Sequence, residues 1–209
     1  MVDVKGRKIT ALFCYPLCAI ARNEIGQTVM NSNTFVSHSI VKEFLETAER
    51  FCSLIENHSD LSTYQFANQL SELLPLLYRL GHLLPDVEPT TSDGTINTVP
   101  SNKHAAMREE IGAKFGKFDL YREVFDLYNH LDDDPVMMSI GDDISDIYSE
   151  LKPGLSAYSL APLDAVWNWK FGFLNHWGRH LVSSLRAIQY LFSHFLLTET
   201  KIDDAGNGT

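Results

Sequence analysis

The chain has 209 residues, of which 27 are Asp or Glu and 17 are Lys or Arg, so its formal net charge is -10. Nucleic-acid-binding proteins usually carry a basic patch, and the densest basic cluster here is Lys5, Arg7 and Lys8, so we expect no nucleic-acid partner. No long Gly, Ser or Pro linker divides the chain, and its length and 44% hydrophobic content favour one packed domain.

The first thirty residues differ from the rest. Lys5, Arg7 and Lys8 precede an apolar run that ends at Ala21, which resembles a short secretory signal peptide but is too short to span a membrane. Pro16 inside the run argues against a signal peptide. Residues 1–30 are therefore interpreted as an N-terminal extension, with Met30 as an alternative natural start.

Compartment is predicted from the cysteines. Cys14 and Cys18 have neither zinc-finger nor thioredoxin spacing, and Cys52 lies on an apolar helix face. A sparse, odd number of cysteines is typical of a reducing compartment. The sequence therefore predicts a cytoplasmic protein without a membrane span, with secretion through residues 1–21 as the alternative.

Two amphipathic helices are expected next, from about Phe35 to Asn57 and from about Ser62 to Leu84. Ser62 and Gln65 have the spacing of a capping box at the start of the second helix. Pro75 lies inside that helix and predicts a kink or break near residues 71–75. Residues 85–102 contain three prolines and Asp93-Gly94, and are predicted to form a loop.

The middle of the chain is predicted to be helical from Lys103 to about Asn129, with a weak point at Gly112 to Gly116. A further helix is expected to start near Ser139 or Gly141, and Pro153-Gly154 is expected to mark or disturb its end.

The last predicted helix runs from about Pro162 to Leu197. Its apolar residues alternate spacings of four and three, which is typical of a core seam. The seam consists of Trp167, Phe171, Leu174, Gly178, Leu181, Leu185, Ile188, Phe192 and Phe195. Other large residues, including Trp169 and Trp177, fall outside the seam and require a second buried face. Gly178 among large side chains predicts close approach of a neighbouring helix. Residues 31–200 are thus expected to be one all-α domain, a bundle of five or six helices around this long central helix, followed by a disordered tail at 201–209.

Two sets of polar residues are candidate metal ligands. His176 and His180 are four residues apart, which places both rings on one helix face. The acidic set is Asp142, Asp143, Asp146 and Glu150. Asp143, Asp146 and Glu150 share one edge of their helix, and inward-facing carboxylates and histidines build metal sites in helical bundles. The alternative interpretation is two hydrogen-bonded core histidines and a helix N-terminus with solvated charges.

The same helix offers candidate ligand-binding residues. Arg179 and Arg186 could bind an anion or pair with local carboxylates, and Trp169 and Trp177 could contact a ligand or belong to the core.

Several segments resemble a bacterial family of uncharacterised proteins, domain-of-unknown-function family 5063. The most distinctive is Trp167-x-Trp169-x-Phe171-x-Phe173-x-x-His176-Trp177-Gly178-Arg179-His180, accompanied by Asp142-Asp143-Ile144-x-Asp146-Ile147-Tyr148-x-Glu150. The resemblance spans about residues 35–197. It implies an all-helical domain of this size and supplies no activity.

The functional prediction follows from these observations. No phosphate-binding loop, dinucleotide fingerprint, nucleophile elbow or H-E-x-x-H motif is present in the sequence. The chain is interpreted as a cytoplasmic helical module that binds an unknown protein or small molecule, and no cofactor is firmly implied. The alternative is a metal-dependent hydrolase of the bundle type, in which His176, His180 and the acidic set bind a divalent metal ion.

Overall fold

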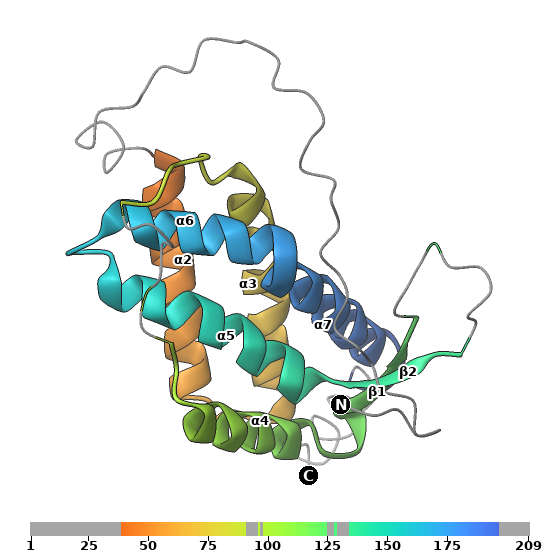
Figure 1. The fold of residues 1–209 in the computed structure, drawn as a ribbon. Helices are drawn as coiled ribbons and strands as arrows, with labels where there is room; N and C mark the ends of the chain where they lie inside the picture. The colour runs from red at the N-terminus through yellow and green to blue at the C-terminus, as the bar shows by residue number, and fades with distance from the viewer. Residues whose placement is uncertain (1–38, 91–95, 97, 125–127, 129–133, 197–209) are drawn as a thin grey trace. The chain divides into compact units, whose positions relative to one another are not determined.

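The computed structural model describes residues 39–90, 96, 98–124, 128 and 134–196 (Figure 1). All of these belong to the unit formed by residues 31–209. The predicted extension at residues 1–30 and the predicted tail at residues 201–209 lie outside the described residues.

The first two helices follow the sequence pattern closely. Helix α2 spans Ser39–Glu56 and helix α3 spans Thr63–Leu83. The predicted capping box is confirmed, because the Ser62 hydroxyl accepts from the Gln65 amide at 3.1 Å and the Ser62 amide donates to the Gln65 side chain at 2.9 Å. Helix α3 continues through Pro75 without a break.

The middle of the chain departs from the predicted helix. Helix α4 spans Ser101–Phe115 and ends at Gly116, whose φ of 56° lies in the left-handed region that favours glycine. A short 3-10 turn, η1 (Gly116–Phe118), leads into strand β1 (Leu120–Glu123). The prediction of a helix as far as Asn129 is therefore wrong at Leu120–Glu123, which form a strand.

Strand β1 forms an antiparallel pair with β2 (Val136–Ser139), with Leu120 opposite Ser139. Side chains alternate between the two faces of a strand, and the more buried positions of β1 are Tyr121 and Glu123. The backbone N–H and C=O groups of Leu120–Glu123 thus form hydrogen bonds with β2 and not with a helical turn.

The remaining helices form the half of the domain that holds the candidate residues. Helix α5 continues past Pro153 without ending there. The predicted last helix is one helical run that contains two π-helical segments. The elements are α5 (Ile140–Ala157), α6 (Pro162–Gly172), η2 (Phe173–Trp177), α7 (Gly178–Leu191) and η3 (Phe192–Leu196).

The π-helical segment η2 changes which residues of this run face the core. A π turn holds more residues than an α turn, so it shifts the phase of the apolar stripe. Phe171 and Leu174, from the predicted seam, are 53% and 65% exposed, whereas Trp169 and Trp177 are completely buried. Near η2, the helical run therefore buries the second face expected from the sequence, with Trp169 and Trp177, and exposes Phe171 and Leu174 of the predicted seam.

Gly178 illustrates the same local geometry. A Cβ atom at this position would lie 2.3 Å from the backbone oxygen of Phe173, five residues earlier in the same helical run. The three atoms nearest to this Cβ position all belong to Phe173, so the crowding at Gly178 comes first from its own helical run and not from the neighbouring helix that was predicted.

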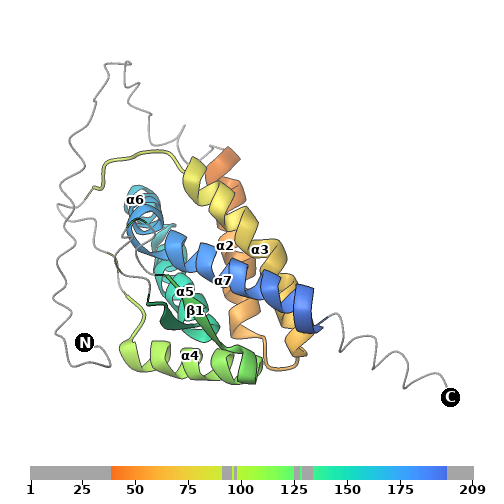
Figure 2. The same cartoon turned by 90° about the vertical axis from the view of Figure 1, so that its right-hand side faces the viewer.

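The helices pack as a bundle, which confirms the predicted all-α fold. Helix α5 packs against α2, α4, α6 and α7, while α7 also packs against α3 (Figures 1 and 2). The buried side chains form one continuous core. Its largest completely buried members include Trp169, Trp177, Tyr148, Phe44, Phe51 and Phe66.

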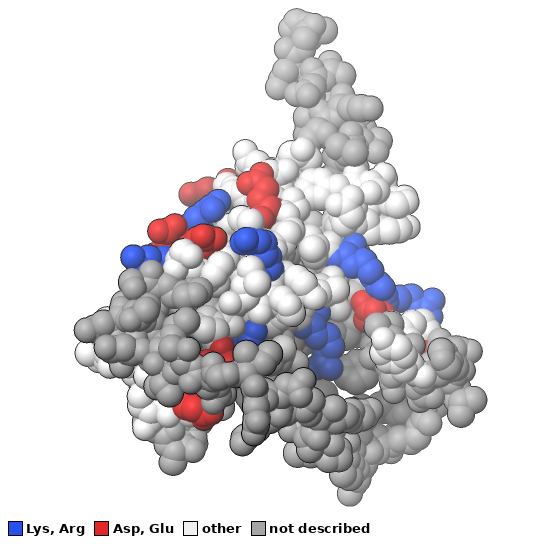
Figure 3. Space-filling model, turned by 90° about the horizontal axis from the view of Figure 1, so that it is seen from above, with Lys and Arg blue, Asp and Glu red and all other residues white. Residues whose placement is uncertain are grey.

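The surface of the described residues is mixed in charge. On the face drawn in Figure 3, acidic and basic side chains lie interspersed. Arg79 and Glu43 form one exposed ion pair, with 3.7 Å between Nη1 and Oε2. Within the described part of the chain, no helix is both long and apolar enough to cross a lipid bilayer.

Candidate metal centre

The acidic edge of α5 and the two histidines of the last helical run face each other. Asp143, Asp146 and Glu150 lie three and four residues apart on α5, which packs against η2 and α7. His176 lies in η2, and His180 lies in the first turn of α7. The convergence that the sequence left open is thus present in the fold.

His180 lies between two carboxylates. Its Nδ1 atom is 2.8 Å from Oδ1 of Asp143, and its Nε2 atom is 3.4 Å from Oδ2 of Asp146. An ionised carboxylate can only accept, so Nδ1 carries the hydrogen of the first contact. In a neutral imidazole, Nε2 then presents its lone pair toward Asp146.

Asp143 is completely buried and has a second hydrogen-bond partner, Tyr121 of β1, whose hydroxyl donates to Oδ2. Burial raises the pKa of Asp143, while the hydrogen bonds from His180 and Tyr121 favour the ionised form. Burial and the neighbouring carboxylate raise the pKa of Tyr121, which therefore remains a donor. Sequence analysis missed Tyr121, because it placed this residue in a helix.

Asp146 is held from the opposite side by His104 of α4. Nε2 of His104 lies 2.9 Å from Oδ1 of Asp146, so the other oxygen, Oδ2, is the one directed at His180. Sequence analysis also missed His104. It lies 42 residues before Asp146, and no spacing rule connects residues on two different helices.

His176 is placed beside Glu150. Nδ1 of His176 is buried and lies 3.1 Å from Oε1 of Glu150, although the alignment falls outside hydrogen-bond geometry. The interaction is thus mainly electrostatic. The Glu150 carboxylate raises the pKa of His176, against the opposing effect of desolvation.

Three of these residues bring potential metal-donor atoms together. One carboxylate oxygen of Asp146 and one ring nitrogen each of His176 and His180 lie within 4.8 Å of one another. Ligands about 2.1 Å from a tetrahedral metal ion stand about 3.4 Å apart, which is the distance between His180 Nε2 and Asp146 Oδ2. Two imidazoles and one carboxylate form a donor set that suits Zn²⁺ or Fe²⁺ better than Mg²⁺ or Ca²⁺.

Asp142 does not join this group. Its Oδ1 atom lies 3.6 Å from Nη1 of Arg108, so Asp142 contacts α4 instead of the histidines. Asp142 also follows the N-cap of α5, where its amide donates to the Ser139 hydroxyl at 3.1 Å. For Asp142 the structure agrees with the alternative interpretation of charge at a helix N-terminus.

The predicted ligand-binding residues fall into two groups. Trp169 and Trp177 are core residues whose indole nitrogens donate to backbone oxygens at 3.1 Å, so the ligand-binding interpretation is corrected for both. Arg179 and Arg186 line a cavity of about 340 Å³ that also includes His180. Nη2 of Arg186 lies 3.0 Å from Oε2 of Glu123, as the alternative of pairing with a local carboxylate anticipated.

Together, the fold and the cluster define a mostly helical bundle domain with a histidine–carboxylate cluster between α5 and the η2–α7 junction. The chain belongs to the family described as "Domain of unknown function (DUF5063)", which matches residues 36–194. This confirms the resemblance found in the sequence. The family description carries no activity.

A solved structure shares the fold. The crystal structure of protein BF1032 from Bacteroides fragilis matches with a TM-score of 0.64 and 23% sequence identity, covering 74% of this chain and 93% of that one. No curated protein matches the sequence.

Proposed function

We propose that this domain binds a divalent transition-metal ion through Asp146, His176 and His180. The observation that supports the proposal most strongly is the pair His180 Nε2 and Asp146 Oδ2, 3.4 Å apart. With Nδ1–H committed to Asp143, a neutral His180 would direct a lone pair at a carboxylate oxygen. A cation between the two atoms turns this repulsion into coordination.

The surrounding hydrogen bonds support the same proposal. Metal-bound histidines usually donate their second ring N–H to a carboxylate, and metal-bound carboxylates are themselves hydrogen-bonded. Here Asp143 accepts from His180 and His104 contacts Asp146. This outer layer orients the donor atoms before a metal ion arrives.

The competing explanation is a protonated His180. An imidazolium ion carries N–H groups on both nitrogens and could interact with Asp143 and Asp146 at once. That arrangement would be a buried ion pair without a metal function. The two explanations make opposite predictions for metal binding.

The bound metal ion would in turn bind a small ligand. Three protein ligands leave at least one coordination position for water or a ligand, and a bound divalent ion acts there as a Lewis acid. The side chains of Asp146, His176 and His180 are 21%, 43% and 11% exposed, so solvent reaches the cluster.

The compartment proposed for this function is the bacterial cytoplasm. Cys52 is buried and unpaired, as expected of a protein in a reducing environment. The structural match from Bacteroides fragilis supports a bacterial origin.

Isothermal titration calorimetry of chelator-treated protein with Zn²⁺, and then with Mn²⁺, tests metal binding. We expect saturable binding of one ion per chain. Asp146→Asn and the double variant His176→Ala/His180→Ala should abolish it. Asp142→Asn and His82→Ala, which change a carboxylate and a histidine outside the cluster, should leave it intact. Absence of binding in the wild type, or equal binding in Asp146→Asn, would contradict the proposal.

A further inference from the structure

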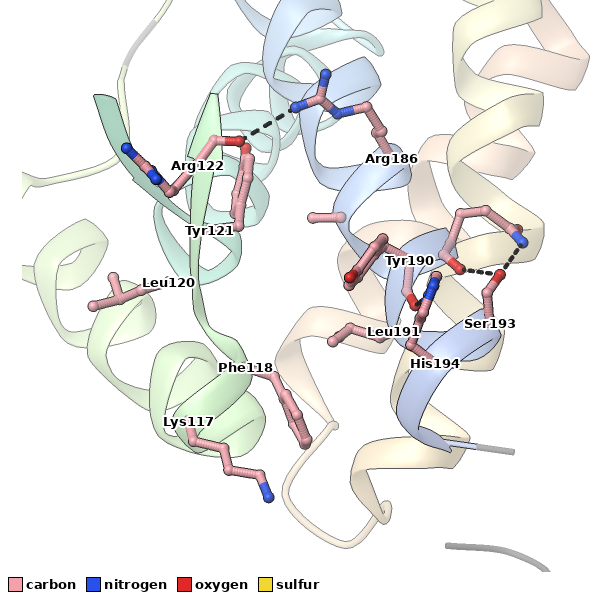
Figure 4. A pocket seen from close by; sticks show the side chains of 12 residues that line it. Lys117, Phe118, Leu120, Tyr121, Arg122, Arg186, Tyr190, Leu191, Ser193 and His194 are labelled. Carbon is pink, nitrogen blue, oxygen red and sulfur yellow. Dashed lines mark hydrogen bonds between the residues drawn. The ribbon is translucent and has the colours of Figure 1, made fainter. Parts of the chain in front are cut away.

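A second cavity, of about 1020 Å³, lies between β1 and the C-terminal half of α7 with η3 (Figure 4). Its lining does not include Asp146, His176 or His180. The cavity is therefore separate from the proposed metal site, and it is large enough for a small organic molecule.

Most of the cavity wall is apolar or aromatic. Phe118 and Tyr121 line it from the side of β1, while Ala187 and Leu191 line it from α7 (Figure 4). The Tyr121 hydroxyl is bonded to Asp143, so this residue offers its ring to the cavity. Such a wall favours the alkyl part of a ligand.

The charged side chains that line the cavity, among the described residues, are all basic. Among the described residues, the lining includes Lys117, Arg122 and Arg186 but no Asp or Glu, although the whole chain has a net charge of -10. Arg186 is paired with Glu123 at 3.0 Å, and the Arg122 guanidinium points away from the cavity in Figure 4. Of these three cations in the described part of the lining, Lys117 is thus the one that remains for a ligand.

Lys117 lies at one end of the cavity, beyond the apolar wall (Figure 4). Its Nζ atom stands 4.7 Å from the centre of the Phe118 ring, and among the described residues it has no carboxylate at salt-bridge distance. The left-handed Gly116 immediately before it ends α4 and turns the chain toward β1. The backbone therefore places a cation where an apolar cavity meets solvent.

We propose that this cavity binds an amphipathic organic anion with an unbranched alkyl chain and a terminal carboxylate. The alkyl chain lies against Phe118, Tyr121, Ala187 and Leu191, and the carboxylate pairs with Lys117. Charge complementarity at one end and apolar burial along the wall together select this class of ligand. The proposal does not depend on metal binding.

The test is calorimetric titration of the full chain with dodecanoate, below its micelle concentration and with a chelator present. Dodecyltrimethylammonium, which has the same alkyl chain and the opposite charge, is titrated for comparison. The variant Lys117→Glu is compared with Lys42→Glu, which changes an exposed lysine on α2 that does not line the cavity. Thermal melts establish that both variants fold.

We expect one dodecanoate per chain, affinity at least about tenfold lower in Lys117→Glu, and no change in Lys42→Glu. Dodecyltrimethylammonium should bind more weakly than dodecanoate to the wild type. Equal binding of the two amphiphiles, equal loss in both variants, or no dodecanoate binding would overturn the proposal. Because the chelator removes metal ions, failure here is distinguishable from failure of the proposed metal site.

Discussion

The buried carboxylate of Asp143 lies 2.8 Å from Nδ1 of His180, on the side of the ring opposite Asp146. This contact fixes the orientation of the imidazole and directs Nε2 toward the other carboxylate. It joins α5 to α7 at the point where the acidic edge and the histidine pair meet. The proposed metal function depends on this relationship as much as on the donor atoms themselves.

Asp143→Asn should weaken metal binding without abolishing it. An asparagine amide cannot accept from His180 and Tyr121 as two carboxylate oxygens do, so the imidazole loses its fixed orientation. Loss of such an outer partner typically lowers metal affinity by about 10- to 100-fold. Calorimetry with Zn²⁺ measures the effect, and Asp142→Asn is the control. Unchanged affinity in Asp143→Asn would show that Asp143 does not position a metal ligand.

Gly178→Ala should destabilise the domain by about 1–3 kcal/mol, because the added Cβ would press against the backbone oxygen of Phe173. A backbone atom cannot move aside as a side chain can, so this cost should exceed the gain from the higher helix propensity of alanine. Urea denaturation measures the free energy of unfolding. Val182→Ala, an exposed change on the same helix, should cost much less. Equal stability of Gly178→Ala and the wild type would mean that the π turn does not require glycine.

Cys52 should be unreactive in the folded protein. Burial raises the pKa of its thiol to about 12, so almost no thiolate is present at neutral pH, and only 2% of the residue is exposed. In a Cys14→Ser/Cys18→Ser background, a thiol reagent such as dithionitrobenzoate should react with Cys52 only after addition of denaturant. Rapid reaction under native conditions would contradict the burial of this face of α2.

Protonation of Glu56 should contribute to a lower free energy of unfolding in acid. Burial alone would raise its pKa, but Lys152 at 2.6 Å and the Tyr148 hydroxyl at 2.7 Å outweigh burial and hold the pKa below its usual value. A lowered folded-state pKa adds stability above the unfolded value of about 4.3, and this contribution is lost as pH falls through the folded value.

Glu56→Gln should therefore be less stable than the wild type at neutral pH, and the difference should shrink as the pH is lowered from about 5 to about 3. Urea denaturation across this range measures it, with the exposed Glu49→Gln as the control. A difference that is independent of pH would show that the Glu56 charge contributes nothing.

Much of the architecture was predictable because helical periodicity and capping are local properties. Ser62 and Gln65 mark the start of α3, and the acidic edge of α5 follows from residue spacing alone. The strand at Leu120–Glu123 was not predictable in this way, because its stability comes from pairing with residues 13 to 19 positions further along the chain.

The candidate site was predictable in part for the same reason. The spacing of His176 and His180, and of Asp143, Asp146 and Glu150, places each set on one side of a helix. Their convergence, and the supporting roles of His104 and Tyr121, depend on which helices and strands pack together. The π-helical η2 also could not be read from the apolar seam, which placed Phe171 and Leu174 in the core.

The most direct test of the proposed metal centre is anomalous X-ray scattering from crystals soaked in Zn²⁺, with data collected on both sides of the zinc absorption edge. The proposal predicts one strong anomalous peak per chain, within bonding distance of Asp146, His176 and His180. It also predicts that crystals of Asp146→Asn lack this peak. A strong peak elsewhere with none between these three side chains, or no peak in the wild type, would contradict it.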